Sequence, residues 1–349
     1  MSRHVRTLID LVFAVIVAAI VAFVGLKAID SVQWPAFNSS NVTRALTTTG
    51  QVVAVVILVI AALLYRYGRP RWVVTLLSTV GISGLVPAPP GMPRGATRLY
   101  LFGLSADQQF RTEYLTRLTS SPRLADMTYL HLAPYYPAGW FWGGGRYASL
   151  MGMPGWEAFK PWAILSMAVA AAVGVVLWAR MVRTDRGTAA ALAVTIVTLM
   201  YAGPEPYAAV LILIGVPMLI PMLYGLRGRS RHADGPTSDL RGGTSWAAVI
   251  ATGLFLGLSA TFYTLYTGLF AGVAILMAVA LIVQGWVGAS NKALPRDVVS
   301  NTRRRTTLAI LGRLVVMGVI AGLVALTVWA PYLLARARSQ PASGGTAEH

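Results

Sequence analysis

Asp107 and Arg111 are the two residues whose types and spacing are best suited to chemistry. Four residues make about one helical turn, so both side chains would lie on the same side of a helix. One interpretation is structural: Asp107 stabilises the positive amino-terminal end of that helix and pairs with Arg111. The other is catalytic: Asp107 is a carboxylate base at the lipid–water boundary, beside an arginine that binds phosphate.

A second group of candidate residues is an aromatic run, which is followed directly by three glycines and Arg146. Tryptophan and tyrosine commonly anchor proteins at a membrane surface. Their flat faces also suit the apolar faces of sugar rings, and the glycines would add flexible backbone beside them. The run therefore indicates either interfacial anchors or a carbohydrate site. Its candidate sugar-binding members are Tyr135, Tyr136, Trp140 and Trp142.

Glu205 is the third feature, because it stands between Pro204 and Pro206 at the edge of an apolar stretch. An acid in such a place is either a solvated turn residue or a group that orients a substrate hydroxyl. The residues leave both interpretations open.

The composition shows what kind of protein must position these residues. Of 349 residues, 56% are hydrophobic and only 12% are charged, against about 25% charged in soluble domains. This excludes a disordered chain, a fibrous repeat and an ordinary soluble enzyme, and it predicts an integral membrane protein. The net charge of +17 could indicate nucleic-acid binding. The basic residues fall at the ends of apolar runs instead, so no nucleic-acid partner is expected.

A membrane helix needs about 20 mostly apolar residues, and the uncharged stretches predict an all-α polytopic protein with about nine transmembrane helices. The charge-free stretch Gly242–Asn291 is too long for one span and would break near Thr264–Thr267, which makes it a helical hairpin. The other predicted spans are Leu8–Leu26, Val52–Tyr65, Trp72–Val86, Trp162–Ala179, Thr188–Ala202, Tyr207–Leu226 and Leu314–Leu334.

Lysine and arginine predict the orientation. Short cytoplasmic loops retain these residues, and most of the 29 lie on one set of alternate loops if the amino terminus is cytoplasmic. The intervening connections at Ala202–Pro206 and Thr264–Thr267 carry none. The first span is expected to be a retained signal-anchor helix, because its apolar stretch is longer than that of a typical signal peptide.

Between the third and fourth spans lies a segment far longer than the usual connection of about 4–6 residues. The chain therefore divides into three spans (1–86), an extracytoplasmic catalytic segment (87–161), six further spans (162–334) and an extracytoplasmic tail (335–349). Ser105 and Gln108 fit a capping box. The residues that follow predict an amphipathic helix on the membrane surface, with its aromatics facing the lipid and its charges facing water.

Metal binding is not indicated. Cysteine is absent, so disulfides and thiolate-bound metals are excluded. The four histidines are scattered without ligand spacing, which argues against a zinc site. We expect no cofactor; several acids could bind a divalent cation, but a mechanism with a single base does not demand one.

Three segments resemble a known family. They are DQQFRTEYLTRLT at 107–119, PYYPAGWFWGGGR at 134–146 and PGWEAFKPWAI at 154–164. They are similar to the galactan-priming arabinofuranosyltransferases (arabinofuranosyltransferase A) of mycobacteria and related actinobacteria, and the layout of spans matches that family's amino-terminal membrane region. The family's proteins are considerably longer, so the chain is expected to be an amino-terminal part.

The resemblance implies a GT-C membrane glycosyltransferase fold. It implies a donor, decaprenyl-phosphoryl-arabinose, and an acceptor, the galactofuranose chain of cell-wall arabinogalactan. It also places transfer on the outer face of the plasma membrane and assigns Asp107 the role of base.

A sugar on a lipid phosphate already has a good leaving group, so a single base is sufficient for an inverting transfer. Positive charge near the phosphate would stabilise the departing anion. The candidate donor-binding residues are Arg111, Arg117, Arg146 and Lys160. The candidate acceptor-binding residues are Gln108, Tyr135, Tyr136, Trp140, Trp142 and Glu205.

Two other functions compete with the enzyme. A transporter would need ionisable residues or broken helices near the bilayer midplane and an internal repeat; the sequence has neither, although Gly215-Val216-Pro217 could interrupt a helix. A non-catalytic assembly subunit would use the aromatic run as a docking surface. Transfer from a polyprenyl-phosphate sugar distinguishes the three.

Overall fold

In the described part of the chain, nine helices fall where the apolar stretches predicted spans. The computed structural model describes residues 3–36, 40–100, 106–129, 132–228, 245–290 and 296–339. The nine helices are α1 (Arg3–Asp30), α2 (Asn41–Arg66), α3 (Arg71–Leu85), α7 (Gly155–Met181), α8 (Thr184–Tyr201), α9 (Pro206–Arg227), α10 (Ser245–Phe262), α11 (Thr264–Ser290) and α12 (Arg296–Ser339).

Seven membrane-spanning candidates meet the requirements of length and apolarity within the described ranges, and they include all of these helices except α8 and α10. Helix α10 is apolar but short, and α8 carries Asp185 in its first turn. The chain is therefore an all-α polytopic membrane protein, and the count of nine spans stays a prediction. The predicted hairpin is confirmed, since α10 and α11 are separated by Tyr263 alone.

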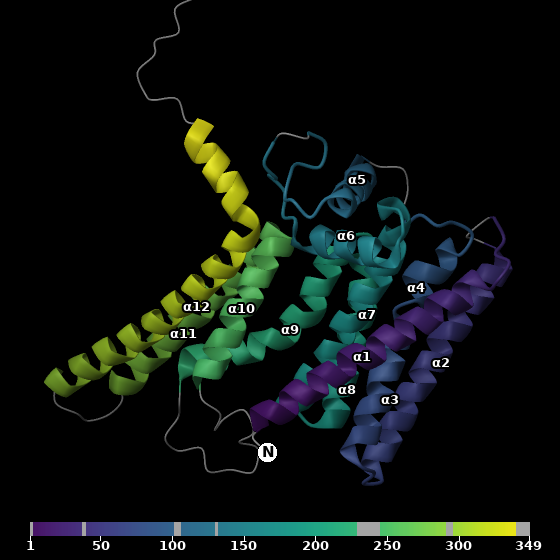
Figure 1. Cartoon of the computed structure of the whole chain (residues 1–349). Coiled ribbons are helices and arrows are strands. Elements are labelled where there is room, and N and C mark those ends of the chain that lie inside the picture. The colour runs from purple at the N-terminus through teal and green to yellow at the C-terminus, as the bar shows by residue number, and fades with distance from the viewer. Residues whose placement is uncertain are drawn as a thin grey trace, which may run out of the picture.

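The helices alternate in direction, so their connections gather at two ends of the bundle. The amino terminus and the α2–α3 and α7–α8 connections lie at the lower end of Figure 1. The short helices α5 (Ala106–Ser120) and α6 (Gly139–Met151) lie at the opposite end. Helix α12 contains Pro331, and its last turns bend away from the bundle, as expected where proline removes a helical hydrogen bond.

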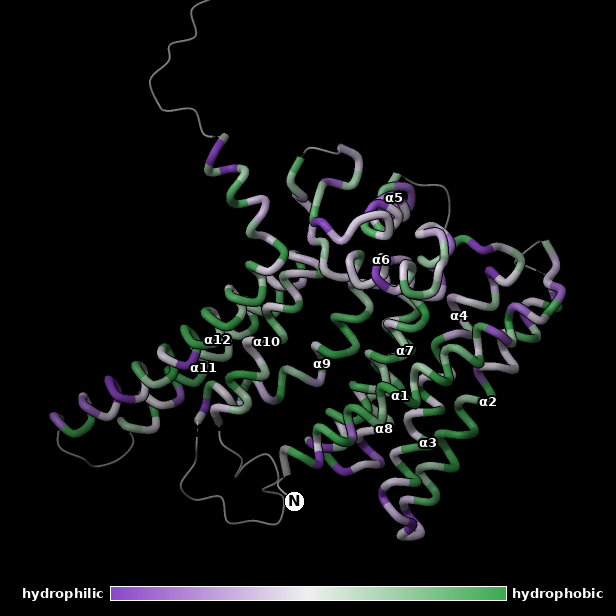
Figure 2. The backbone as a smooth tube through the Cα atoms, in the orientation of Figure 1, coloured by the Kyte–Doolittle hydropathy of each residue, from purple (hydrophilic) through white to green (hydrophobic). Residues whose placement is uncertain are grey.

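Hydropathy follows the same division. Apolar residues run along the middle of the long helices, while polar residues gather at the helix ends and in α5 (Figure 2). Two short elements, α4 (Ala88–Gly91) and η1 (Met92–Arg94), continue from α3 toward the α5–α6 end.

Helix α5 confirms the predicted helix of the long segment, with Asp107 in its first turn. The predicted cap, Ser105, lies outside the described residues. The prediction that its aromatics face the lipid and its charges face water was partly wrong. The buried face of α5 includes polar residues and packs against α6 and α7. Its buried residues are Gln108, Arg111, Tyr114, Leu115 and Leu118.

Helix α6 contains the glycines that were expected to be flexible, and this expectation was wrong. They are helical, and a Cβ added at Gly145 would lie 2.5 Å from the carbonyl oxygen of Leu118 in α5. A Cβ at Gly144 would similarly meet Leu115 and Trp162. These glycines therefore allow close helix packing. The helix ends at Met151 and is followed by Gly152, whose φ of +63° suits a left-handed cap.

Beneath α5 and α6 lies an apolar core rich in aromatic side chains. Trp140 is fully buried, with ring centroids 5.2 Å from Phe141 and 5.3 Å from Phe159. Phe141 also lies 5.1 Å from Tyr114 of α5. This core joins the long segment to α7 and α9 and gives the exposed end of α5 a rigid base.

Candidate active site

The amino-terminal end of α5 faces the turn between α8 and α9. The i, i+4 spacing predicted for Asp107 and Arg111 is confirmed, and Arg111 Nη2 lies 3.6 Å from Asp107 Oδ2. Helix α8 ends at Tyr201 and α9 begins at Pro206, so the Pro204 carbonyl in the turn between them lies outside both helices and is open to contact by α5.

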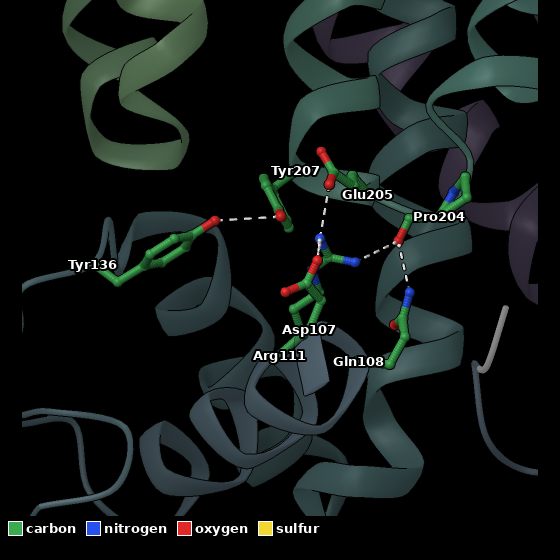
Figure 3. A network of polar contacts seen from close by, with 7 residues as sticks. All are labelled: Asp107, Gln108, Arg111, Tyr136, Pro204, Glu205 and Tyr207. Carbon is green, nitrogen blue, oxygen red and sulfur yellow. Dashed lines mark hydrogen bonds and ion pairs between the residues drawn. The ribbon is translucent and has the colours of Figure 1, made fainter. Parts of the chain in front are cut away.

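Arg111 is the centre of the polar network drawn in Figure 3. Its Nη2 donates to Oε1 of Glu205 at 2.7 Å, and its Nη1 donates to the carbonyl oxygen of Pro204 at 3.5 Å. The Arg111 side chain is only 5% exposed, whereas Glu205 is 35% exposed and Asp107 69% exposed. One buried guanidinium thus holds two carboxylates that reach the solvent.

Gln108 adds a second link to the same turn. Its Nε2 donates to the carbonyl oxygen of Pro204 at 3.3 Å, on the side of the turn away from Glu205. Gln108 therefore fixes the turn by a backbone contact, and its predicted role in binding a sugar is not needed to explain its burial.

Tyr136 and Tyr207 close one side of the network. The Tyr136 hydroxyl donates to the Tyr207 hydroxyl at 3.3 Å, and the Arg111 guanidinium lies 5.6 Å from the centre of the Tyr207 ring. Burial raises the pKa of Tyr136 above its ordinary value, so the hydroxyl keeps its proton at neutral pH. A cation over the face of an aromatic ring is a favourable contact.

The charges of this cluster bear on its chemistry. Two carboxylates are compensated by one guanidinium, and the shorter contact is to Glu205. The predicted role of Arg111 in phosphate binding is therefore disfavoured, since its charge is already paired and its side chain is buried. Asp107 is the carboxylate with more exposure and the weaker pairing, which leaves it accessible to a substrate hydroxyl.

Two other predicted phosphate ligands have structural contacts instead. Arg146 Nη2 donates to the carbonyl oxygens of Leu118 and Thr119, which are orphan acceptors at the carboxyl end of α5. Lys160 lies in α7, where its Nζ donates at 2.9 Å to the carbonyl oxygens of both Arg94 and Thr97. Each cation is used to satisfy backbone acceptors, which disfavours the predicted phosphate contacts.

Trp140 was predicted to stack on a sugar, and its position contradicts this. It is fully buried, and its indole nitrogen donates to Ser166 Oγ at 3.1 Å, so neither face of the ring is open to a ligand. Trp142 is 41% exposed, with its indole nitrogen bonded to the carbonyl oxygen of Pro122 at 3.0 Å. Tyr135 is 58% exposed. These two aromatic residues have ring surface that a ligand could reach.

Arg117 lies on α5 six residues after Arg111, about 9 Å further along the axis and on a different side of the helix. It therefore does not join the Arg111 network. Within the described ranges, no three histidine, aspartate or glutamate side chains are placed to hold a metal ion. The expectation that no cofactor is needed stays a prediction.

Two members of the polar network were missed from the sequence. The first is the Pro204 carbonyl, a backbone group with no sequence signal beyond the proline itself. The second is Tyr207, whose position directly after the Pro-Glu-Pro turn could have drawn attention. Glu205, by contrast, is both a turn residue and a member of the network.

Comparison with known proteins identifies the family. Residues 10–349 match the family described as arabinofuranosyltransferase N terminal. The chain belongs to this family. The resemblance drawn from the three motifs is thereby confirmed.

Curated relatives agree. Proteins named galactan 5-O-arabinofuranosyltransferase match from Mycolicibacterium smegmatis (44% identical, over 99% of this chain and 50% of the relative) and Mycobacterium tuberculosis (46%, over 97% and 49%). One from Corynebacterium glutamicum is 39% identical, over 98% of this chain and 50% of the relative. The chain thus spans about half the length of the curated relatives it matches.

Proposed function

We propose that this arabinofuranosyltransferase N-terminal chain takes part in arabinogalactan synthesis by transferring arabinofuranose from decaprenyl-phosphoryl-arabinose to the galactofuranose chain. The names of its relatives support the reaction and the acceptor. The observation that carries the proposal is the exposed Asp107 carboxylate, held by the buried Arg111 next to Glu205. The lipid-linked donor and a GT-C type of fold follow from the resemblance and belong to the proposal.

In the proposed reaction, Asp107 accepts the proton of the acceptor hydroxyl. The hydroxyl oxygen forms a bond to the anomeric carbon of arabinofuranose as the bond from that carbon to the phosphate oxygen breaks. Decaprenyl phosphate leaves as an anion, so no general acid is required. The configuration at the anomeric carbon inverts, because attack and departure occur on opposite faces.

Arg111 has a positioning role in this proposal. It pairs with both carboxylates and, through the Pro204 carbonyl, fixes the turn that carries Glu205. Glu205 is well placed to accept a hydrogen bond from a second substrate hydroxyl, since it is partly exposed and, among the described residues, only its Oε1 is bonded, to Arg111. The two carboxylates would then orient the acceptor while only Asp107 takes its proton.

The test uses a chimera in which this chain replaces the matching half of the Mycolicibacterium smegmatis relative. Isolated membranes are supplied with a lipid-linked arabinofuranose donor and a synthetic galactofuranosyl acceptor. Replacing Asp107→Asn keeps the size of the side chain and removes the base. We expect transfer to fall about 10²- to 10⁴-fold, the usual contribution of a general base.

Glu113→Gln is the matched control, because Glu113 is an exposed acid on the same helix and bonds only locally to Gln109 among the described residues. It should leave transfer near the wild-type rate. Near-normal transfer by Asp107→Asn would refute the assignment of the base. Solute uptake without transfer would favour a transporter, and the absence of both transfer and uptake would favour an assembly subunit.

We also propose that α5 and α6 face the outside of the plasma membrane and that the amino terminus is cytoplasmic, since the basic residues support this orientation. The chain has no cysteine, so single cysteines can be labelled without background. A cysteine replacing Tyr135 should react with a membrane-impermeant maleimide in intact cells. One replacing Tyr67, in the α2–α3 connection, should react only after permeabilisation; the reverse pattern would refute the orientation.

A further inference from the structure

The connection between α10 and α11 brings two tyrosines to the candidate site from the far end of the chain. Tyr263 is the one residue between the helices, and Tyr266 follows in the first turn of α11. Both side chains are half-buried. Sequence patterns marked this region only as a helix break.

Ring contacts place the pair beside the Arg111 network. The Tyr263 ring lies 5.2 Å from that of Tyr207 in an edge-to-face arrangement, and Tyr266 lies 5.5 Å from Tyr263. Tyr207 in turn lies under the Arg111 guanidinium and accepts the hydrogen bond from Tyr136. The two tyrosines therefore continue the row of rings that begins with Tyr136 and Tyr207. These four residues form the aromatic wall of the candidate site.

This position is held by close packing. A Cβ added at Gly139, the first residue of α6, would lie 2.8 Å from the carbonyl oxygen of Thr261 near the end of α10. Gly139 therefore allows the backbones of α6 and α10 to meet directly. The connection cannot move away from the site without breaking this contact, so Tyr263 is fixed where it stands.

The two tyrosines lie near the charged cluster, since Tyr263 contacts the Tyr207 ring that lies under Arg111. Tyr263 interacts electrostatically with Glu205, Arg111 and Asp107, and Tyr266 with Glu205. Within the described ranges neither hydroxyl makes a hydrogen bond. Each phenol can donate one hydrogen bond and accept another, so both are available to a ligand that also reaches Glu205.

The charge of the cluster indicates which ligand this is. The two carboxylates and one guanidinium beside this wall carry a net negative charge. This charge repels a phosphate and favours neutral hydroxyl groups as donors to Glu205. Resting on the proposed function, we propose that Tyr263 and Tyr266 bind the hydroxyl groups of a neutral sugar ring beside Glu205. The sugar is either the acceptor's galactofuranose or the donor's arabinofuranose, and the phosphate lies away from this wall.

An alternative explanation is that the tyrosines only anchor the hairpin at the membrane surface. The two explanations predict different kinetics. An anchor contributes through its ring, so removing the hydroxyl leaves substrate binding unchanged. A sugar-binding tyrosine contributes through its hydroxyl, so Tyr→Phe, which keeps the ring contacts, weakens binding of one substrate.

The experiment measures KM for donor and acceptor separately in the chimera carrying Tyr263→Phe, Tyr266→Phe or both. We expect each single change to raise one KM about two- to tenfold, the effect of losing one neutral hydrogen bond. A higher KM for the acceptor assigns galactofuranose to this wall, and a higher KM for the donor assigns arabinofuranose. Tyr332→Phe is the control, since its ring packs on Trp329 in a similar way but its hydroxyl accepts from Arg336.

Binding of a synthetic galactofuranosyl oligosaccharide and of an alkyl arabinofuranoside, followed by titration calorimetry, gives a measure independent of transfer. If the chimera transfers arabinofuranose but the Phe variants change neither KM nor binding, the inference is overturned and the proposed function stands. If the chimera binds one of these sugars through Tyr263 yet transfers nothing, the sugar site stands and the proposed reaction fails.

Discussion

Helices α5 and α6 are consecutive in the chain and contact each other, yet their chemically versatile residues lie in different surroundings. On α5, Asp107 and Arg111 meet the α8–α9 turn and present two carboxylates to solvent. On α6, Trp140 and Arg146 are directed into the protein, where the indole contacts other rings and the guanidinium satisfies backbone carbonyls. The α5 end thus keeps polar groups open to a proposed ligand, whereas the side chains of α6 pack against α5 and the core.

The comparison shows that residue type alone does not identify a site. Tryptophan and arginine suit both sugar recognition and core packing, and α6 uses them for packing because its glycines allow α5 and α7 to approach closely. A polar group identifies a site when it is fixed by one neighbour and still reaches solvent. Asp107 and Glu205 meet that condition, while Trp140 does not.

The largest effect is expected at Trp140, where Trp140→Ala would empty a fully enclosed volume among four aromatic rings. Burial predicts a loss of about 3–5 kcal/mol in the free energy of unfolding, measured by denaturation of the purified chain in detergent. Trp142→Ala is the matched control and should cost less, since Trp142 is 41% exposed. A stable Trp140→Ala protein with a raised KM for sugar would reverse the assignment of α6 to packing.

A smaller effect distinguishes the two arginines. Arg111→Met keeps the apolar stem but leaves Glu205 without its cation, and we expect transfer to fall about 10- to 100-fold, equivalent to about 1.5–3 kcal/mol for a hydrogen bond to a charged group. Arg146→Met removes two bonds to backbone carbonyls and should lower the free energy of unfolding by about 1–3 kcal/mol.

These variants are compared by measuring transfer per folded molecule alongside thermal unfolding. Arg146→Met should leave the rate per folded molecule unchanged, whereas Arg111→Met should not. Equal rates for the two variants would remove the proposed distinction between the α5 and α6 surfaces.

Much of the fold followed from local patterns. The apolar stretches predicted the positions of the nine helices because a membrane span is a property of consecutive residues. The hairpin was predicted to break near Thr264–Thr267, next to the observed break at Tyr263. The helix that begins near Asp107 was predicted from its capping box and amphipathic spacing. The helix ends were less accurate: α2 begins at Asn41, well before the predicted Val52, because polar residues at a span's end remain helical in water.

The candidate site was only partly predictable. The pairing of Asp107 with Arg111 follows from a four-residue spacing, but Arg111 and Glu205 are 94 positions apart and no periodicity connects them. Tyr263 is more distant still. Lys160 and Arg146 were candidate phosphate ligands together with Arg111, which lies closest in sequence to Asp107. A basic side chain looks the same in the sequence whether it binds phosphate or a backbone carbonyl.

The sequence by itself determined that the chain is a helical membrane protein, where its helices run, and which family it resembles, because hydropathy, charge placement and motifs are properties of neighbouring residues. The tertiary structure alone decided that Arg111 is buried between the exposed Asp107 and the partly exposed Glu205. It also decided that Trp140 belongs to the core and that Tyr263, between α10 and α11, contacts Tyr207 at the start of α9. The physical reason is that burial and the pairing of charges depend on which surfaces the packed helices bring together.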